Sequence, residues 1–116
     1  MNSILKLALL VSVVATLNGC YYDKESDLYP NSYCDMTVYS YSGAIKSIMT
    51  TNCATTNCHV TGATAPDLST YDGVFAAKDR VIFRACTQKN MPSSAPISNC
   101  AMAKLQKWVS AGALNN

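Results

Sequence analysis

The chain has 116 residues, including six cysteines and one histidine, and its formal net charge is +2. This length fits one domain, and so small a positive charge does not favour nucleic-acid binding. The apolar residues are unevenly distributed, because only 15 of the 97 residues after position 19 are Leu, Ile, Val or Phe. This is few for a self-supporting core, so we expect disulfides, a metal or a large apolar cofactor to complete the fold.

Residues 1–19 have the layout of a signal peptide. One positive charge precedes an apolar run at residues 7–17, which is too short to span a bilayer. The run leads into residues 17–20 (LNGC), which resemble the lipobox of bacterial lipoproteins. We therefore expect lipid on Cys20 and a periplasm-facing location in the cell envelope, with an uncleaved anchor or an ordinary cleaved signal as alternatives. Tyr21, where an aspartate would suggest the inner membrane, favours the outer membrane.

Residues 20–41 are interpreted as a lipidated tether and the start of the domain. Residues 21–37 mix charged residues, Ser, Asn and Pro, and show neither helical nor strand periodicity, whereas residues 38–42 (VYSYS) are compatible with an extended segment. The predicted all-α domain spans residues 42–116. It begins with a short helix that has Ser42 as its expected N-cap and leads to Cys53. The predicted core positions of this helix are Ile45, Ile48 and Met49.

Two further helical regions are predicted in the domain. The first follows a loop that contains Gly62 and Pro66, and its expected buried residues are Val74, Phe75, Val81, Ile82 and Ala85. Residues 86–97 hold two prolines and two serines and are not expected to form a regular element. Ser98 is the predicted N-cap of a final amphipathic helix, which ends near Gly112. The apolar face of this helix consists of Ala101, Leu105, Trp108 and Val109.

The strongest chemical signal is the string CATTNCH at residues 53–59, which contains the only histidine. Covalent haem attachment needs two thiols and an imidazole close to the second thiol. Cys58 and His59 keep this adjacency, although four residues rather than two separate Cys58 from Cys53. The small or polar residues between the cysteines are expected to bulge outward, so that both thiols reach one haem.

Two other interpretations of this string are a disulfide and a zinc site. A disulfide would join Cys53 to Cys58 and leave His59 on the surface. A zinc site fits the string less well, because the adjacent side chains of Cys58 and His59 are poorly placed to ligate one tetrahedral ion. Such a site would also need further reduced ligands, which would come from Cys34, Cys86 or Cys100.

Met91 is the candidate for the second axial ligand of haem iron. A thioether is a soft, neutral donor, and Met91 lies in an irregular segment that Pro92 stiffens. Met49 and Met102 are instead expected in the core, as methionines on helical faces usually are. Met36 is assigned to the tether.

These features resemble a class I c-type cytochrome domain over residues 42–114. More narrowly, TNCATTNCHVTGATAPDLSTYDGV, KNMP and KLQKWVSAGALNN are similar to short, lipoprotein-type monohaem cytochromes with a four-residue spacer. The resemblance implies a small helical bundle around one covalent haem c, attached through Cys53 and Cys58, with His59 and Met91 as axial ligands. It also implies contact between the first and last helices. Pro66 is the matching candidate for the proline carbonyl that family members bond to the proximal imidazole.

Three cysteines remain after lipid and haem are assigned: Cys34, Cys86 and Cys100. A bond between Cys86 and Cys100 would close the base of the Met91 loop. A bond between Cys34 and Cys100 would tie the start of the domain to the final helix. Similar sequences carry the second pair together, so the resemblance favours Cys34 with Cys100 and leaves Cys86 over.

The expected function is one-electron transfer without substrate chemistry, so no enzyme activity and no small-molecule substrate are predicted. The sequence has no Gly-rich phosphate loop and no evident acid/base pair.

Redox proteins are the expected partners. Acidic docking surfaces would suit a basic patch near Met91, although scattered solvated lysines explain the same residues. Candidate contacts of the haem propionates are Arg80, Arg84 and Tyr71. The alternatives are a haem-based sensor with a labile or absent Met91 ligand, and a haem-free lipoprotein held by disulfides.

Overall fold

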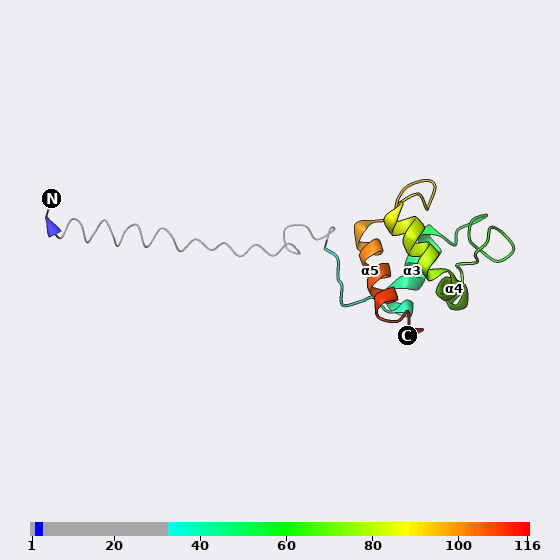
Figure 1. Cartoon of the computed structure of the whole chain (residues 1–116), viewed down its shortest axis with the longest axis horizontal. Helices are drawn as coiled ribbons and strands as arrows, with labels where there is room; N and C mark the ends of the chain where they lie inside the picture. The colour runs from blue at the N-terminus through cyan, green and yellow to red at the C-terminus, as the bar shows by residue number, and fades with distance from the viewer. Residues whose placement is uncertain (1, 4–32) are drawn as a thin grey trace. The chain divides into compact units, whose positions relative to one another are not determined.

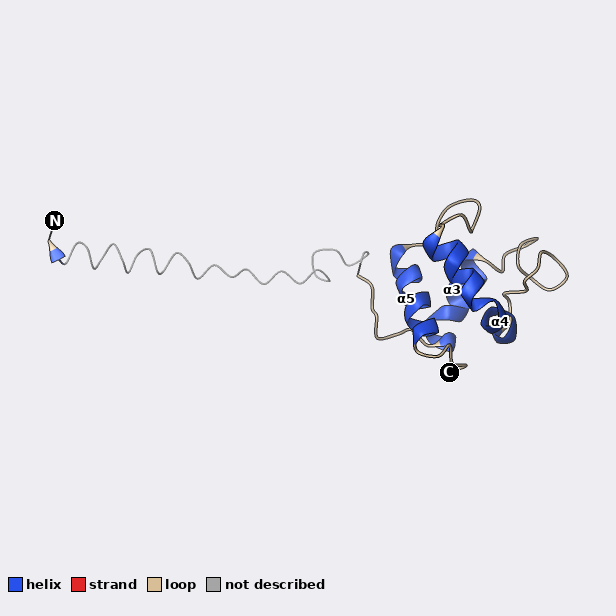
Figure 2. Ribbon diagram, in the orientation of Figure 1, coloured by secondary structure: helices blue, strands red, loops and turns tan. Residues whose placement is uncertain are grey.

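The computed structural model describes residues 2–3 and 33–116, and Cys34–Asn116 form one compact unit. The predicted signal peptide, the lipidation site at Cys20 and most of the tether lie outside the described residues. Figure 2 shows the unit as helices joined by loops, and no strand occurs in residues 33–116. The all-α prediction is confirmed for this unit. Within the described part of the chain, no helix is long and apolar enough to cross a membrane.

The first helical segment begins with η1, a π-helical turn at Tyr41–Ile45, and continues into α3 at Lys46–Asn52. Its N-cap is Ser40, whose hydroxyl accepts a hydrogen bond from the Gly43 N–H at 3.1 Å. The prediction of Ser42 was wrong, because Ser40 has the extended backbone of a cap residue, whereas Ser42 already lies inside the turn. Ile45 and Met49 are buried as predicted, Ile48 is half-buried, and α3 ends directly before Cys53.

The middle of the unit consists of α4 at Tyr71–Val81 and η2, a π-helical segment at Ile82–Thr87 that continues it. Thr70 is the N-cap of α4, and its hydroxyl accepts a hydrogen bond from the Gly73 N–H. Val74, Val81 and Ala85 are buried as predicted, and Ile82 is half-buried. Phe75 was wrongly predicted as core, because it is 40% exposed. It lies one residue, or about 100° of helix, away from the buried stripe, and its ring packs under the Lys78 ammonium.

The last helix, α5, spans Asn99–Ser110 and has the predicted N-cap, since the Ser98 hydroxyl accepts from the Ala101 N–H. Leu105 and Trp108 are buried, and Ala101 and Val109 are half-buried. Gly112 has φ +99°, a left-handed conformation that glycine adopts without strain. The chain therefore turns back after α5.

The C-terminal residues fold back onto the helices. The indole N–H of Trp108 donates to the Leu114 carbonyl at 2.9 Å, and the Tyr71 hydroxyl donates to the Ala113 carbonyl at 2.9 Å. The carbonyl of Asn116 accepts from the Ser42 N–H at 2.8 Å, and its side-chain oxygen accepts from the Tyr41 N–H. The end of the chain thus satisfies free donors at the start of η1.

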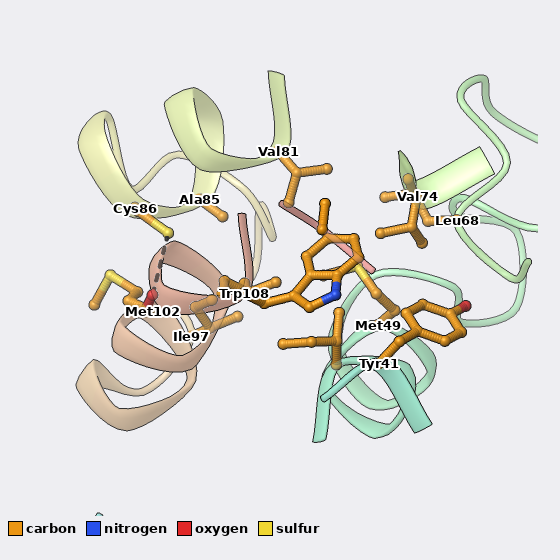
Figure 3. Close-up of a cluster of buried hydrophobic side chains, with 13 residues drawn as sticks. Tyr41, Met49, Leu68, Val74, Val81, Ala85, Cys86, Ile97, Met102 and Trp108 are labelled. Atoms are coloured by element: carbon orange, nitrogen blue, oxygen red, sulfur yellow. Dashed lines mark hydrogen bonds between the residues drawn. The ribbon is translucent and has the colours of Figure 1, made fainter. Parts of the chain in front are cut away.

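The core lies between α5 and the other helices. α5 packs against η1 and η2, so the contact between the first and last helical segments that the resemblance implies is present (Figure 1). Figure 3 shows the Trp108 indole in the middle of the buried cluster, with Val81, Met49 and Tyr41 around it. The rings of Tyr41 and Trp108 are 6.0 Å apart. Complete burial of one large apolar side chain contributes about 1.5–3 kcal/mol.

A disulfide joins Cys34 to Cys100 across 66 residues. The predicted pairing is confirmed, and the alternative bond between Cys86 and Cys100 is not formed. Lys107 in α5 adds a second attachment, because its Nζ donates to the Met36 carbonyl at 2.8 Å and lies 4.4 Å from the centre of the Tyr39 ring. These contacts fix the segment before η1 against α5.

Cys86 is a free thiol inside the core. Its side chain lies on η2, is buried, and donates a weak hydrogen bond to the Met102 carbonyl of α5, drawn as a dashed line in Figure 3. Burial raises the pKa of this thiol, and the nearby Lys89 opposes the rise. Met102 and Met49 are both buried, as predicted for core methionines.

Candidate cofactor site

A cleft of about 580 Å³ lies between the loop after α3, the junction of α4 with η2, and the loop before α5. Cofactor and ligand sites commonly measure about 300–1,000 Å³. Four of the residues that line the cleft are those predicted to bind haem: Cys53, Cys58, His59 and Met91. Two thiols, an imidazole and a thioether therefore face one space, although Met91 is far from the others in sequence.

The segment between Cys53 and Cys58 forms a compact turn. The Cys58 N–H donates to the Thr55 carbonyl at 2.9 Å, and the His59 N–H donates to the Cys53 carbonyl at 3.1 Å. Asn57 has φ +64°, a left-handed conformation that asparagine tolerates better than most residues. The four-residue spacer thus returns the chain to Cys53, so both cysteines reach the cleft.

The two thiols of this turn differ in environment. Cys53 is half-buried, and this burial, with a smaller contribution from Cys58, raises its pKa to about 11. Cys58 is exposed. Both cysteines are free in the structure, so the alternative in which they form a disulfide is not what the fold contains.

The His59 ring is oriented by the Pro66 carbonyl, whose oxygen lies 3.0 Å from Nδ1. A carbonyl oxygen only accepts hydrogen bonds, so Nδ1 carries a hydrogen, and in the neutral ring the lone pair is then on Nε2. Metal-binding histidines are commonly oriented in this way by a carbonyl or carboxylate. The Pro66 contact implied by the resemblance is present, and His59 has the tautomer of an Nε2 ligand.

The loop that carries Met91 is held at both ends. At its start the Asn90 N–H donates to the Arg84 carbonyl at 3.1 Å, and Lys89 adopts a left-handed conformation with φ +53°. At its end Ile97 is buried directly before the Ser98 cap. Met91 itself lies at the cleft and is 36% exposed. Its thioether is accessible, and its loop is anchored near the cleft on both sides.

Two arginines give the cleft a positive side. Arg80 and Arg84 are separated by one helical turn and both line the cleft, whereas its lining contains no Asp or Glu. Such a pair suits the carboxylates of an anionic cofactor. Tyr71 was grouped with them in the sequence analysis, but it does not line the cleft, and its hydroxyl donates to the Ala113 carbonyl.

The zinc interpretation finds no support in residues 33–116. Among these residues no three His, Cys, Asp or Glu side chains come together as a metal site requires. Cys34 and Cys100, two of the proposed extra ligands, are bonded to each other, and the third, Cys86, lies in the core.

One residue near the site was missed from the sequence: Asp67. Its carboxylate accepts hydrogen bonds from Thr61 and Ser69 on either side of Pro66. The Asp-x-Ser pattern of residues 67–69 is a local turn signal, and it predicts the bond between Asp67 and Ser69. It does not predict the bond to Thr61, because that bond depends on how the loop closes.

The described cleft offers two attachment thiols, one oriented imidazole, one thioether and two guanidinium groups. These groups fit a flat, apolar, anionic macrocycle with a central iron better than they fit a bare metal ion. Comparisons of the chain with protein-family models, with curated proteins and with solved structures found no match in any of the three.

Proposed function

We propose that the protein is a lipid-anchored monohaem c-type cytochrome that carries single electrons between redox partners in the periplasm or at the cell envelope. The observation that carries this proposal is the convergence of Cys53, Cys58, His59 and Met91 on one cleft, with Nδ1 of His59 already bonded to Pro66. The scarcity of aliphatic residues after position 19 supports it, because a buried macrocycle supplies apolar surface that the side chains lack.

Each group at the cleft has a role in holding the cofactor. Cys53 and Cys58 form the two thioether bonds, and His59 Nε2 and the Met91 sulfur bind the iron. Arg80 and Arg84 pair with the propionates. The apolar lining, formed by Leu68, Val81 and Ala85, excludes water from the macrocycle. When bound, haem with a His/Met ligand pair supplies a one-electron couple with a raised potential.

The charge of the domain supports an acidic redox partner. Residues 33–116 contain seven Lys and Arg but only four Asp and no Glu. Arg80 and Arg84 are committed to the propionates, whereas Lys89, two residues before Met91, is available to an acidic partner. A partner with an acidic surface is therefore steered toward the cleft. Its association rate should fall as salt is added, because exposed charges are screened beyond about 10 Å at 0.1 M.

Lipidation of Cys20 follows from the lipobox-like sequence, and it places the domain on the periplasmic side, with the outer membrane favoured. In a bacterial host, the native chain should enter the membrane fraction and incorporate labelled fatty acid. Cys20→Ala should lose the label, while the folded domain keeps its absorbance. A native chain without label would contradict the anchor and leave the cofactor assignment untouched.

The decisive experiment for the cofactor is expression in an exporting host that has haem-maturation machinery. The purified protein should carry haem that survives denaturation and shows low-spin spectra in both oxidation states. The band from methionine-to-iron charge transfer should disappear in Met91→Ala and persist in Met36→Ala, since Met36 does not line the cleft. Colourless protein would contradict the proposal and favour the haem-free, disulfide-held lipoprotein.

The exposure of Met91 favours one further candidate, a haem-based sensor in which an external ligand takes the place of the thioether. The same preparation separates the two functions. Ready binding of carbon monoxide by the native ferrous protein, with a high-spin spectrum, would favour the sensor. A low-spin ferrous protein that binds carbon monoxide only after Met91→Ala would favour the electron carrier.

A further inference from the structure

The loop that follows His59 is closed by hydrogen bonds that converge on Asp67. One carboxylate oxygen accepts from the Thr61 hydroxyl at 2.6 Å. The other accepts from the Ser69 N–H at 2.9 Å and from the Ser69 hydroxyl. The Leu68 N–H donates to the His59 carbonyl at 2.8 Å, which closes the base of the loop. Asp67 thus links the outgoing and returning limbs of the loop.

The backbone of Asp67 is also fixed, because the start of α4 packs directly on it. A Cβ atom added at Gly73 would clash with the Asp67 carbonyl oxygen. The preceding residue, Pro66, presents its carbonyl to Nδ1 of His59. The position of this acceptor is therefore determined by contacts on the next residue in the chain. A displaced Asp67 would therefore move the Pro66 carbonyl relative to the imidazole.

We infer that Asp67 is a positioning residue for His59, an inference that rests on the proposed function of His59 as an iron ligand. Its carboxylate keeps the loop closed, so that the Pro66 carbonyl stays on Nδ1 and the lone pair stays on Nε2. A hydrogen bond at Nδ1 also makes the imidazole a stronger donor to a metal. Asp67 therefore adjusts the electron density that His59 delivers, although it does not line the cleft.

The ionisation of Asp67 is consistent with this role. Hydrogen bonds from the Ser69 and Thr61 hydroxyls, and then from the Ser69 N–H, hold the pKa of its carboxyl below the ordinary value. The group is an anion at neutral pH and accepts from three donors at once. An ionised acceptor forms stronger hydrogen bonds than a neutral one.

Asp35 provides a matched control. It accepts from the Thr37 N–H at 2.9 Å and from the Thr37 hydroxyl at 2.6 Å, so it forms the same kind of local turn as Asp67 with Ser69. Within residues 33–116, Asp35 has no hydrogen bond beyond Thr37, and it does not line the cleft. Asp35→Ala removes the same charge and the same type of turn, and it leaves the His59 loop unchanged.

The first test uses the full chain, made without haem, and nitrogen NMR of its single histidine. The native chain should show His59 mainly with hydrogen on Nδ1. In Asp67→Ala the hydrogen should move mainly to Nε2, as in free histidine, whereas Asp35→Ala should match the native chain. Thr61→Val should shift the tautomer partly without changing charge, and Asp67→Asn should restore part of the Nδ1–H form. An unchanged tautomer in Asp67→Ala, or an equal change in Asp35→Ala, would overturn the inference.

The second test is the reduction potential of the haem-loaded chain. In Asp67→Ala and in Thr61→Val, the His59 imidazole should donate less electron density to the iron. The reduction potential of both variants should therefore be higher than that of the native chain and of Asp35→Ala. If Asp67→Ala does not fold, the Thr61→Val variant provides the test. A native His59 tautomer and a native reduction potential in Thr61→Val would then refute the role of Asp67. A chain that takes up no haem would refute the proposed function, while the NMR test of the haem-free chain would still judge Asp67.

Discussion

The core around Trp108 and the loops at the cleft are built from different interactions. Around Trp108, buried side chains from η1, α4, η2 and α5 meet, and the C-terminal residues hydrogen-bond back to them. At the cleft, the chain runs in loops whose shape depends on individual hydrogen bonds, such as those of Asp67, and on close backbone contacts at Gly73. The comparison teaches that one side of the domain stabilises itself, whereas the other side presents an open surface, where the proposed haem would add packing.

Removal of the Trp108 side chain should have the largest effect on the self-supporting side. Trp108→Ala should lower the free energy of unfolding by about 3–5 kcal/mol, because a large buried side chain leaves a cavity. Urea denaturation followed by circular dichroism measures this loss. Leu114→Ala, at a side chain that is 58% exposed, should change stability by less than about 0.5 kcal/mol. Equal losses in the two variants would contradict the comparison.

The disulfide should have the next largest effect. Replacement of both Cys34 and Cys100 by Ala should cost about 4 kcal/mol on the chain-entropy estimate for a loop of this length. Denaturation with and without reducing agent measures it, since the reductant should weaken the native chain and leave the double variant unchanged. Cys86→Ala, which removes a buried thiol but no bridge, should retain the effect of the reductant. A double variant as stable as the native chain would contradict this prediction.

Two glycines compare backbone packing beside the loop after His59 with packing at the start of η1. A methyl group at Gly73 would clash with the rigid Asp67 carbonyl, and one at Gly43 would meet the Ser40 hydroxyl at 2.7 Å. Gly73→Ala should therefore cost about 1–3 kcal/mol, as overpacking does. Gly43→Ala should be milder, because the Ser40 hydroxyl is able to rotate away and only its cap bond, worth about 1 kcal/mol, is lost. Thermal unfolding of both variants tests this order, and a larger loss at Gly43 would reverse the interpretation.

The smallest predicted effect concerns the two cleft thiols before haem is attached. The pKa of Cys53 lies at about 11 rather than 9.0, so less of it is thiolate at neutral pH. The higher nucleophilicity of its thiolate offsets part of this deficit, and the net reaction should be about tenfold slower than at a thiol of ordinary pKa. Iodoacetamide should therefore label the exposed Cys58 first, and labelling of Cys53 should accelerate as the pH rises toward 11. Mass spectrometry of the peptides measures both rates, and faster labelling of Cys53 would contradict the prediction.

Sequence patterns predicted the elements whose signals are local. The Ser98 cap, the turn at Gly112 and the buried Leu105 and Trp108 follow from helical spacing and capping chemistry, and all are present. Ser40 was missed because two nearby serines carry the same local signal, and only the backbone conformation separates them. Phe75 was misplaced for a related reason, since spacing alone did not indicate which side of α4 packs on the core.

The candidate site shows the same division between local and long-range information. Cys53, Cys58 and His59 were found because their spacing is itself the signal, and Pro66 came from the resemblance. Asp67 was not found, because its bond to Thr61 exists only after the loop has closed. A glycine such as Gly73 gives no sequence sign that another segment passes within contact distance of its backbone. Sequence thus predicted the groups that would bind the cofactor, and the structure adds Asp67, which we infer positions His59.

The attachment of Cys34 to α5 has a mechanical consequence for the lipid anchor proposed at Cys20. Tension applied to the preceding chain enters the domain at Cys34 and passes through the covalent bridge to Cys100. The load is then borne by α5, which carries the buried Trp108 and Leu105. The segment from residue 35 to η1 lies outside this load path, and so do the loops at the cleft. With the proposed anchor at Cys20, the domain would be held through α5 rather than through the loops around His59.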